Sequence, residues 1–158
     1  MAMHFHNQNG TISLNNNTVT GSAKGILANS GSAAWTVTGN SVTGVQDQGP
    51  QVGMGFHSLQ AEGSVTASDN SITSVGSVGL GLMSNLADVA LNANTVSDTW
   101  SNTGGGILAR VGIGVVIVDS LSVTLTSNTI SNNAFAGVLI DLSGVDGAAT
   151  ITLTNNTS

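Results

Sequence analysis

SVTLTSNTIS, residues 122–131, holds both signals that decide the fold of this 158-residue chain. In its first half, Val123 and Leu125 alternate with hydroxyl-bearing residues, which is the period-2 pattern of a β-strand with one buried face. Its second half, Asn128 to Ser131, is a four-residue phrase: Asn, then Ser or Thr, then Val or Ile, then Ser or Thr. The stretch therefore predicts a short strand that ends in a turn.

The same phrase recurs along the chain at intervals of 23 to 34 residues. Including a truncated last copy, its asparagines are Asn17, Asn40, Asn70, Asn94, Asn128 and Asn156. A second phrase, Gly-apolar-any-apolar, falls between the copies and begins at Gly25, Gly53, Gly79, Gly106 and Gly137. The positions five and three residues before each repeated Asn are always apolar. Such self-similarity is the signature of a repeat protein, whose stacked units share one core.

The Asn-[Ser/Thr]-[Ile/Val]-[Ser/Thr] turn and the later Gly-apolar-any-apolar strand resemble the right-handed parallel β-helix repeat of the pectin-lyase-like superfamily. Repeat regions of bacterial surface proteins and adhesins are of this kind, and the resemblance covers essentially the whole chain. It implies an all-β, single-stranded parallel β-helix of about six coils and three parallel sheets. The glycine content and the β-branched residues exclude a helical fold.

We expect residues 1–158 to form a single β-helix segment. Met3 to His6 matches Met54 to His57, so the chain starts inside a coil, and it stops directly after the Asn156 turn. The sequence shows neither a capping helix nor a charged terminal coil, which solenoids normally use to block end-to-end association. Two interpretations remain open: a segment excised from a longer solenoid, or a protomer that stacks into one.

The composition restricts the partners of the chain. Lys24 and Arg110 are its only Lys and Arg residues, and the formal net charge is −6. Such a chain cannot neutralise a row of phosphates, so neither a nucleic acid nor an anionic membrane surface is expected. Val111–Val118, the most apolar stretch, is too short for a membrane span. Met1–Gly10 lacks a secretory signal, so an extracellular or cell-surface location comes from the resemblance alone.

The repeated Asn column is predicted to be structural. Asparagine tolerates the left-handed backbone of a sharp corner, and stacked amides can hydrogen-bond from coil to coil in a ladder. The glycine that opens the later strand is predicted to form a second corner. Neither column indicates chemistry.

One outward polar column follows the glycine-led strand and supplies candidate ligand-binding residues. Alignment on that strand gives His6, Asn29, His57, Met83, Arg110 and Asp141. Arg110 and Asp141 then become neighbours, which predicts a surface ion pair or, with His57, a small-ligand site. Asp47 and Asp98, from longer coils, are further candidates because loops can converge. His4 and His6 have no acid beside them in register, so no metal and no cofactor are predicted.

The preceding outward column of the same strand reads His4, Leu27, Gly55, Gly81, Leu108 and Leu139. Leu27, Leu108 and Leu139 are unexpected on a solvent-facing strand. They predict either cover by the Val111–Val118 insertion or a stripe for self-association. The glycines between the leucines predict a shallow trough.

Three classes of function stay open. The resemblance implies a non-catalytic structural or binding module, an adhesin-like rod whose partner is a polysaccharide or another protein chain. The alternative is a polysaccharide-active lyase or glycoside hydrolase, or a carbohydrate-binding fragment; we predict no catalytic residues because the acids fall in different columns. The third is a filament protomer, a homo-oligomer joined through uncapped ends or the leucine stripe, or an ice-binding surface on the Thr-rich outward face.

Overall fold

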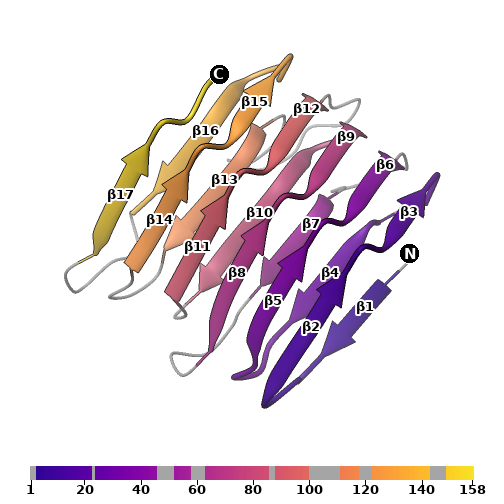
Figure 1. Cartoon of the computed structure of the whole chain (residues 1–158), viewed down its shortest axis with the longest axis vertical. Helices are drawn as coiled ribbons and strands as arrows, with labels where there is room; N and C mark the ends of the chain where they lie inside the picture. Colours follow the sequence, from indigo (N-terminus) through magenta and orange to yellow (C-terminus); the bar gives the residue numbers. More distant parts are fainter. Residues whose placement is uncertain are drawn as a thin grey trace.

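The chain folds into three parallel β-sheets that enclose one core, as the computed structural model shows for residues 3–22, 24–45, 52–57, 63–85, 88–99, 111–117, 122–142 and 149–158 (Figure 1). Sheet A contains β1 (Met3–His6), β4 (Ile26–Asn29), β7 (Val52–His57), β10 (Val78–Asn85), β13 (Val111–Ile117) and β16 (Ala136–Asp141). Sheet B contains β2 (Thr11–Asn15), β5 (Ala34–Thr38), β8 (Ser64–Ser68), β11 (Asp88–Asn92), β14 (Ser122–Thr126) and β17 (Thr150–Thr154). Sheet C contains β3 (Thr18–Thr20), β6 (Ser41–Val45), β9 (Ser71–Val75), β12 (Thr95–Thr99) and β15 (Thr129–Ser131).

The chain visits the three sheets in the order A, B, C and then repeats, so each coil adds one strand to each sheet. Neighbouring strands pair in parallel, and the termini lie at opposite ends of the stack (Figure 1). This confirms the predicted all-β solenoid of three parallel sheets. In the described part of the chain, no helix is long and apolar enough to cross a membrane.

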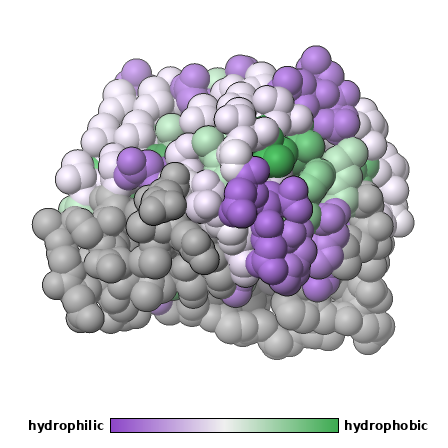
Figure 2. Space-filling model, turned by 90° about the horizontal axis from the view of Figure 1, so that it is seen from below, coloured by the Kyte–Doolittle hydropathy of each residue, from purple (hydrophilic) through white to green (hydrophobic). Residues whose placement is uncertain are grey.

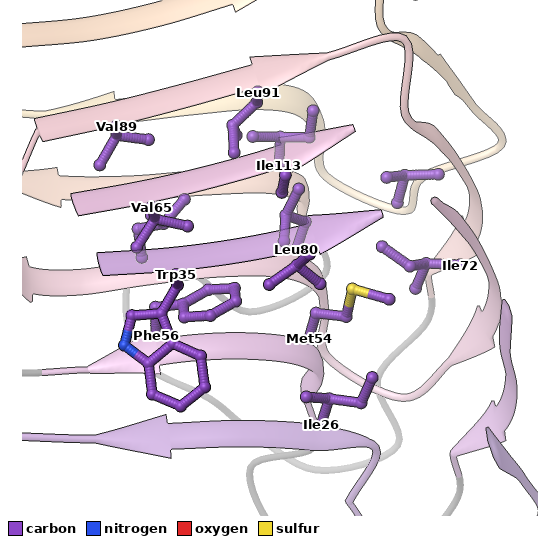
Figure 3. Packing of buried hydrophobic residues seen from close by; sticks show 14 of the residues in the cluster. Ile26, Trp35, Met54, Phe56, Val65, Ile72, Leu80, Val89, Leu91 and Ile113 are labelled. Atoms are coloured by element: carbon purple, nitrogen blue, oxygen red, sulfur yellow. The ribbon is translucent and has the colours of Figure 1, made fainter. Parts of the chain in front are cut away.

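The core consists of columns in which equivalent residues of successive coils stack on one another (Figure 3). The inward column of sheet A contains Ile26, Met54, Leu80 and Ile113, all fully buried. The opposing column of sheet B contains Trp35, Val65, Val89 and Val123. Burial of each large apolar side chain contributes about 1.5–3 kcal/mol, so the stacked columns drive the folding of coils that cannot bury their faces alone.

The repeated asparagines form the predicted ladder. Asn94 donates its backbone N–H and its Nδ2–H to Oδ1 of Asn128, each at 3.0 Å, and Nδ2 also donates to the Ala67 carbonyl at 2.9 Å. Equivalent side-chain bonds link every step of the series from Asn17 to Asn156. Asn40, Asn70, Asn94 and Asn128 are at most 1% exposed. The ladder therefore satisfies backbone groups that the coil corner takes out of water.

The left-handed corner belongs to the residue before each ladder asparagine, which corrects the interpretation that the Asn itself turns the chain. The residues with positive φ at this corner are Asn16 (58°), Gly39 (66°), Asp69 (55°), Ala93 (52°), Ser127 (54°) and Asn155 (53°). Ala93 has no side-chain group that favours this conformation. The stacked ladder and core therefore impose the corner on whatever residue stands there.

The glycines near the start of the sheet A strands do not form the predicted second corner. None of Gly25, Gly53, Gly79, Gly112 and Gly137 has a positive φ. A Cβ on Gly79 would lie 2.7 Å from the backbone oxygen of Gly112 and 2.2 Å from a methyl group of Val96. A Cβ on Gly53 would meet the backbone oxygen of Gly79 in the same way. This column is glycine because successive coils approach one another too closely for a side chain.

Gly79→Ala is expected to lower the free energy of unfolding by about 1–3 kcal/mol, because the added methyl group meets backbone that cannot move without shifting the next coil. Chemical denaturation followed by circular dichroism measures the loss. Gly81→Ala, in the same strand, is the matched control, since its nearest contact is a Val78 methyl group at 3.1 Å. Equal losses in the two variants would contradict the close-approach explanation.

The register of β13 corrects the sequence alignment. β13 places Gly112 beside Gly79, and Ile113 beside Leu80, within sheet A. The sequence alignment places the strand that begins at Gly106 here and treats Val111–Val118 as an insertion, and this prediction is wrong. Ile113 and Val115 fill the core in this register, at 0% and 1% exposure. Residues 100–110 lie outside the described residues.

Candidate ligand-binding site

A groove of about 250 Å³ lies on the outward face of sheet A and is the candidate site. Gly55 and Gly81 form its floor, and they are direct neighbours on β7 and β10. Leu27 precedes them in the same outward column, and Gly114 follows. Because three successive coils carry no side chain at this position, the sheet surface is hollowed there. The trough predicted from the glycines is confirmed.

The walls of the groove come from the two flanking outward columns. Val52 and Val78 form one wall, and His57 and Met83 form the other, each pair being neighbours in register. The Leu27 and Val52 side chains lean over the floor, since a Cβ on Gly55 would lie 2.9 Å and 3.0 Å from their methyl groups. The groove thus crosses the strands and follows the long axis of the solenoid.

Among the described residues, the polar groups that line the groove are basic or neutral. Lys24, one of only two Lys and Arg residues in a chain of net charge −6, lines it together with Asn29 and His57. Asn29 Nδ2 lies 3.1 Å from Nε2 of His4, which orders the amide. A mostly apolar cavity with few polar groups at its rim is the usual form of a small-ligand site. The groove suits a ligand that has an apolar ring face and an anionic substituent.

Among the predicted ligand-binding residues that the structure describes, only His57 lines the groove. Asp141 lies three strands away from His57 in the same outward column, at roughly 14 Å for three strand spacings. Asp98 belongs to sheet C, where its carboxylate accepts hydrogen bonds from Ser97 Oγ at 3.0 Å and Asn132 Nδ2 at 3.2 Å. Asp47 and Arg110 lie outside the described residues.

Two expectations about this face were wrong because they used the alignment at Gly106. Val116, not Arg110, stands beside Asp141 in the sheet. Gly114 occupies the position predicted for Leu108, which itself lies outside the described residues. Leu27 and Leu139 are therefore separated by three glycines, and not by Gly55, Gly81 and Leu108 as the alignment predicts.

Sequence reasoning missed the valine wall. Val52, Val78 and Val111 each begin a Val-Gly-apolar-Gly phrase, and the three phrases align in adjacent strands. This longer phrase is the sequence signal for the valine wall, but it does not by itself exclude Gly106, which begins a strand of the same Gly-apolar-any-apolar pattern.

The other described surfaces give weaker evidence for a binding site. On sheet B the outward Ser and Thr columns align as predicted, although Ala90 and Asn92 interrupt them. Figure 2 shows that the described surface on one face is largely pale, the colour of near-neutral hydropathy, with separate hydrophilic patches and a hydrophobic area between two of them. Within the described ranges, no three His, Cys, Asp or Glu side chains gather as a metal site.

Three parallel sheets around one core, with an internal asparagine ladder and a groove on one sheet, define a parallel β-solenoid that carries a candidate binding site. The right-handed β-helix region family matches residues 2–158, so the chain belongs to that family. The pectin-lyase-like superfamily is consistent with this membership. Comparison with curated proteins and with solved structures found no match.

Proposed function

We propose that the chain is a non-catalytic binding module of a secreted or cell-surface protein, a rigid adhesin-like rod that holds an acidic polysaccharide along sheet A. The observation that carries this proposal is the groove, with its glycine floor, apolar walls, and Lys24 and His57 at its rim. The apolar walls suit the faces of sugar rings, and the Lys24 ammonium suits a sugar carboxylate.

The scaffold favours binding because its recognition surface is already formed. Each interior strand is hydrogen-bonded on both edges, so the groove requires little ordering when a ligand binds. The direction of the groove along the solenoid axis suits an extended polymer. Asp98 and Asp141 lie on different sheets, an arrangement that supports binding rather than a paired-carboxylate reaction.

Titration of the protein with oligogalacturonate, followed by NMR, tests the proposal. We expect methyl signals of Leu27, Val78 and Met83 to shift, and a neutral dextran oligomer to bind more weakly. Lys24→Gln should weaken oligogalacturonate binding roughly fivefold or more, which is about 1 kcal/mol for a charge-assisted contact. Gly81→Val should abolish it by filling the floor.

Thr66→Ala, on the exposed outward face of sheet B, is the matched control and should bind like the unaltered chain. Binding that survives Gly81→Val, or shifts confined to the Thr-rich face, would refute the groove as the site. New sugar ends appearing during the titration would show a polysaccharide-cleaving enzyme instead.

A further inference from the structure

The side chains that can carry positive charge gather on one part of sheet A. Apart from Arg110, which lies outside the described residues, they are Lys24 and the three histidines, His4, His6 and His57. The histidines lie on β1 and β7, and Lys24 precedes β4. These are three adjacent strands of the sheet. A chain of net charge −6 thus concentrates its basic groups beside the groove.

Two outward columns of sheet A hold the histidines in register. His6, Asn29 and His57 stand in one column on adjacent strands, which are about 4.8 Å apart. His4 stands in the next column, and the centroid of its ring lies 6.2 Å from that of His6. The alternation of exposed and half-buried residues along β1 turns both of its histidines outward. The histidine column therefore continues the His57 wall of the groove across β4 and β1.

Asn29 joins the histidines to the groove. It lines the groove, and its Nδ2 lies 3.1 Å from Nε2 of His4. An amide can serve both protonation states of an imidazole, because Nδ2 donates to the neutral ring and Oδ1 accepts from an imidazolium. When Oδ1 turns to a protonated His4, Nδ2 is released to donate to an anion in the groove. The same side chains thus offer an anion more donors in the protonated state than in the neutral one.

Among the described residues, no acidic side chain lies beside these histidines. Asp141 is the only Asp or Glu on the described part of sheet A, and its strand is three places from β7 and five from β1. The side chains that face the histidines are Leu27 and Asn29 of β4 and Met83 of β10, all uncharged, together with the charged Lys24. An imidazole becomes charged as the pH falls from about 8 to 5. Acidification therefore adds positive charges to a surface whose described residues carry no negative charge.

We propose that His4, His6 and Asn29 form an anion subsite that extends the groove and binds the acidic polysaccharide more tightly at mildly acidic pH. This inference rests on the proposed function, because it assigns a second contact to the same ligand. One acidic group of the polymer lies at Lys24 and His57, and another lies at the histidines of β1. The ligand is therefore a chain with repeated acidic groups. Because an anion between imidazoliums reduces their mutual repulsion, binding takes up protons, and the affinity decreases as the pH rises.

Calorimetric titration with oligogalacturonate at about pH 5.5 and about pH 7.5, in the presence of EDTA, tests the subsite. Carboxylic acids titrate near pH ~4, so the probe stays ionised and a pH response comes from the protein. EDTA removes any metal ion that could bridge the imidazoles. We expect roughly tenfold tighter binding at the lower pH, because the imidazoliums add charge-assisted contacts at an exposed surface. Equal affinities at the two pH values would overturn the subsite and leave the groove in place.

His4→Gln combined with His6→Gln separates the subsite from the groove. Glutamine keeps hydrogen-bonding capacity but cannot gain charge, so this double variant should bind like the unaltered chain at the higher pH and lose most of the gain at the lower pH. Lys24→Gln should instead weaken binding at both pH values and retain the pH response. A response that persists in the double variant would overturn the assignment. Absence of binding at both pH values would refute the proposed function together with the subsite.

Thr66→His, added to the double variant, is the matched control for total charge. Thr66 is exposed on the outward face of sheet B, so this change returns an imidazole to the surface without returning it to the column on sheet A. We expect the pH response to remain absent. Its recovery would show that the net charge of the chain, rather than the position of the histidines, governs binding, and it would overturn the proposal.

Discussion

Asn94→Asp should be among the most damaging single substitutions in this chain, lowering the free energy of unfolding by about 3–5 kcal/mol. The change preserves shape but replaces the Nδ2 donor by a carboxylate oxygen. That oxygen would face the Ala67 carbonyl, now 2.9 Å from Nδ2, and Oδ1 of Asn128, now 3.0 Å away. Asn94 is 0% exposed, so water cannot screen the repulsion. Whole domains are stable by only about 5–15 kcal/mol, so much of the fold's stability would be lost.

The measurement is the denaturation midpoint in urea, followed by circular dichroism. Asn17→Asp is the matched control, because it makes the same chemical change at the half-buried first position of the ladder. There the amide loses its 2.8 Å bond to Asn40 Oδ1, and the new charge remains close to water. A loss at Asn17 as large as that at Asn94 would show that burial of the ladder does not set its energetic importance.

Trp35→Ala should also cost about 3–5 kcal/mol, because it leaves a large cavity in the core. Trp35 is 1% exposed and lies between two aromatic rings, with centroid distances of 5.3 Å to Phe5 and 5.9 Å to Phe56, both edge-to-face. Figure 3 shows Trp35 and Phe56 side by side in the core. The deletion therefore removes contacts that join the first three coils.

Trp35→Phe provides the comparison. Trp35 Nε1 is buried with no hydrogen-bond partner among the described residues. An unpaired buried N–H costs about 1–3 kcal/mol, so its removal offsets part of the lost volume. Urea denaturation of the two variants is expected to show a much smaller loss for Trp35→Phe. Similar losses would mean that the indole N–H contributes through a polar partner such as a buried water.

Much of the fold follows from the sequence because its signals are local and repeated. Alternation around Val123 and Leu125 identifies the buried face of a strand without knowledge of its neighbours. Repetition of the Asn phrase then aligns the coils, since identical amides stack best on one another. The ladder and the inward columns of sheet B could therefore be predicted residue by residue, and Gly55 and Gly81 predicted the trough beside Leu27.

Other features depended on which segments approach one another in space. Gly106 and Gly112 both begin acceptable strands, and only the closed coil selects Gly112, which buries Ile113 and Val115. That choice sets Val116 rather than Arg110 beside Asp141. Likewise, the glycine column reflects contact with the next coil's backbone, not a preference visible within its own segment.

The sequence by itself determined the architecture, the three-sheet repeat and the asparagine ladder, because a period-2 pattern and a recurring phrase encode them within each coil. Only the tertiary structure decided the register of β13, the residue that turns each corner, and the groove between the valine wall and His57. These features arise where one coil meets the next, and two coils with equally good local patterns are distinguished only by how completely they fill the shared core.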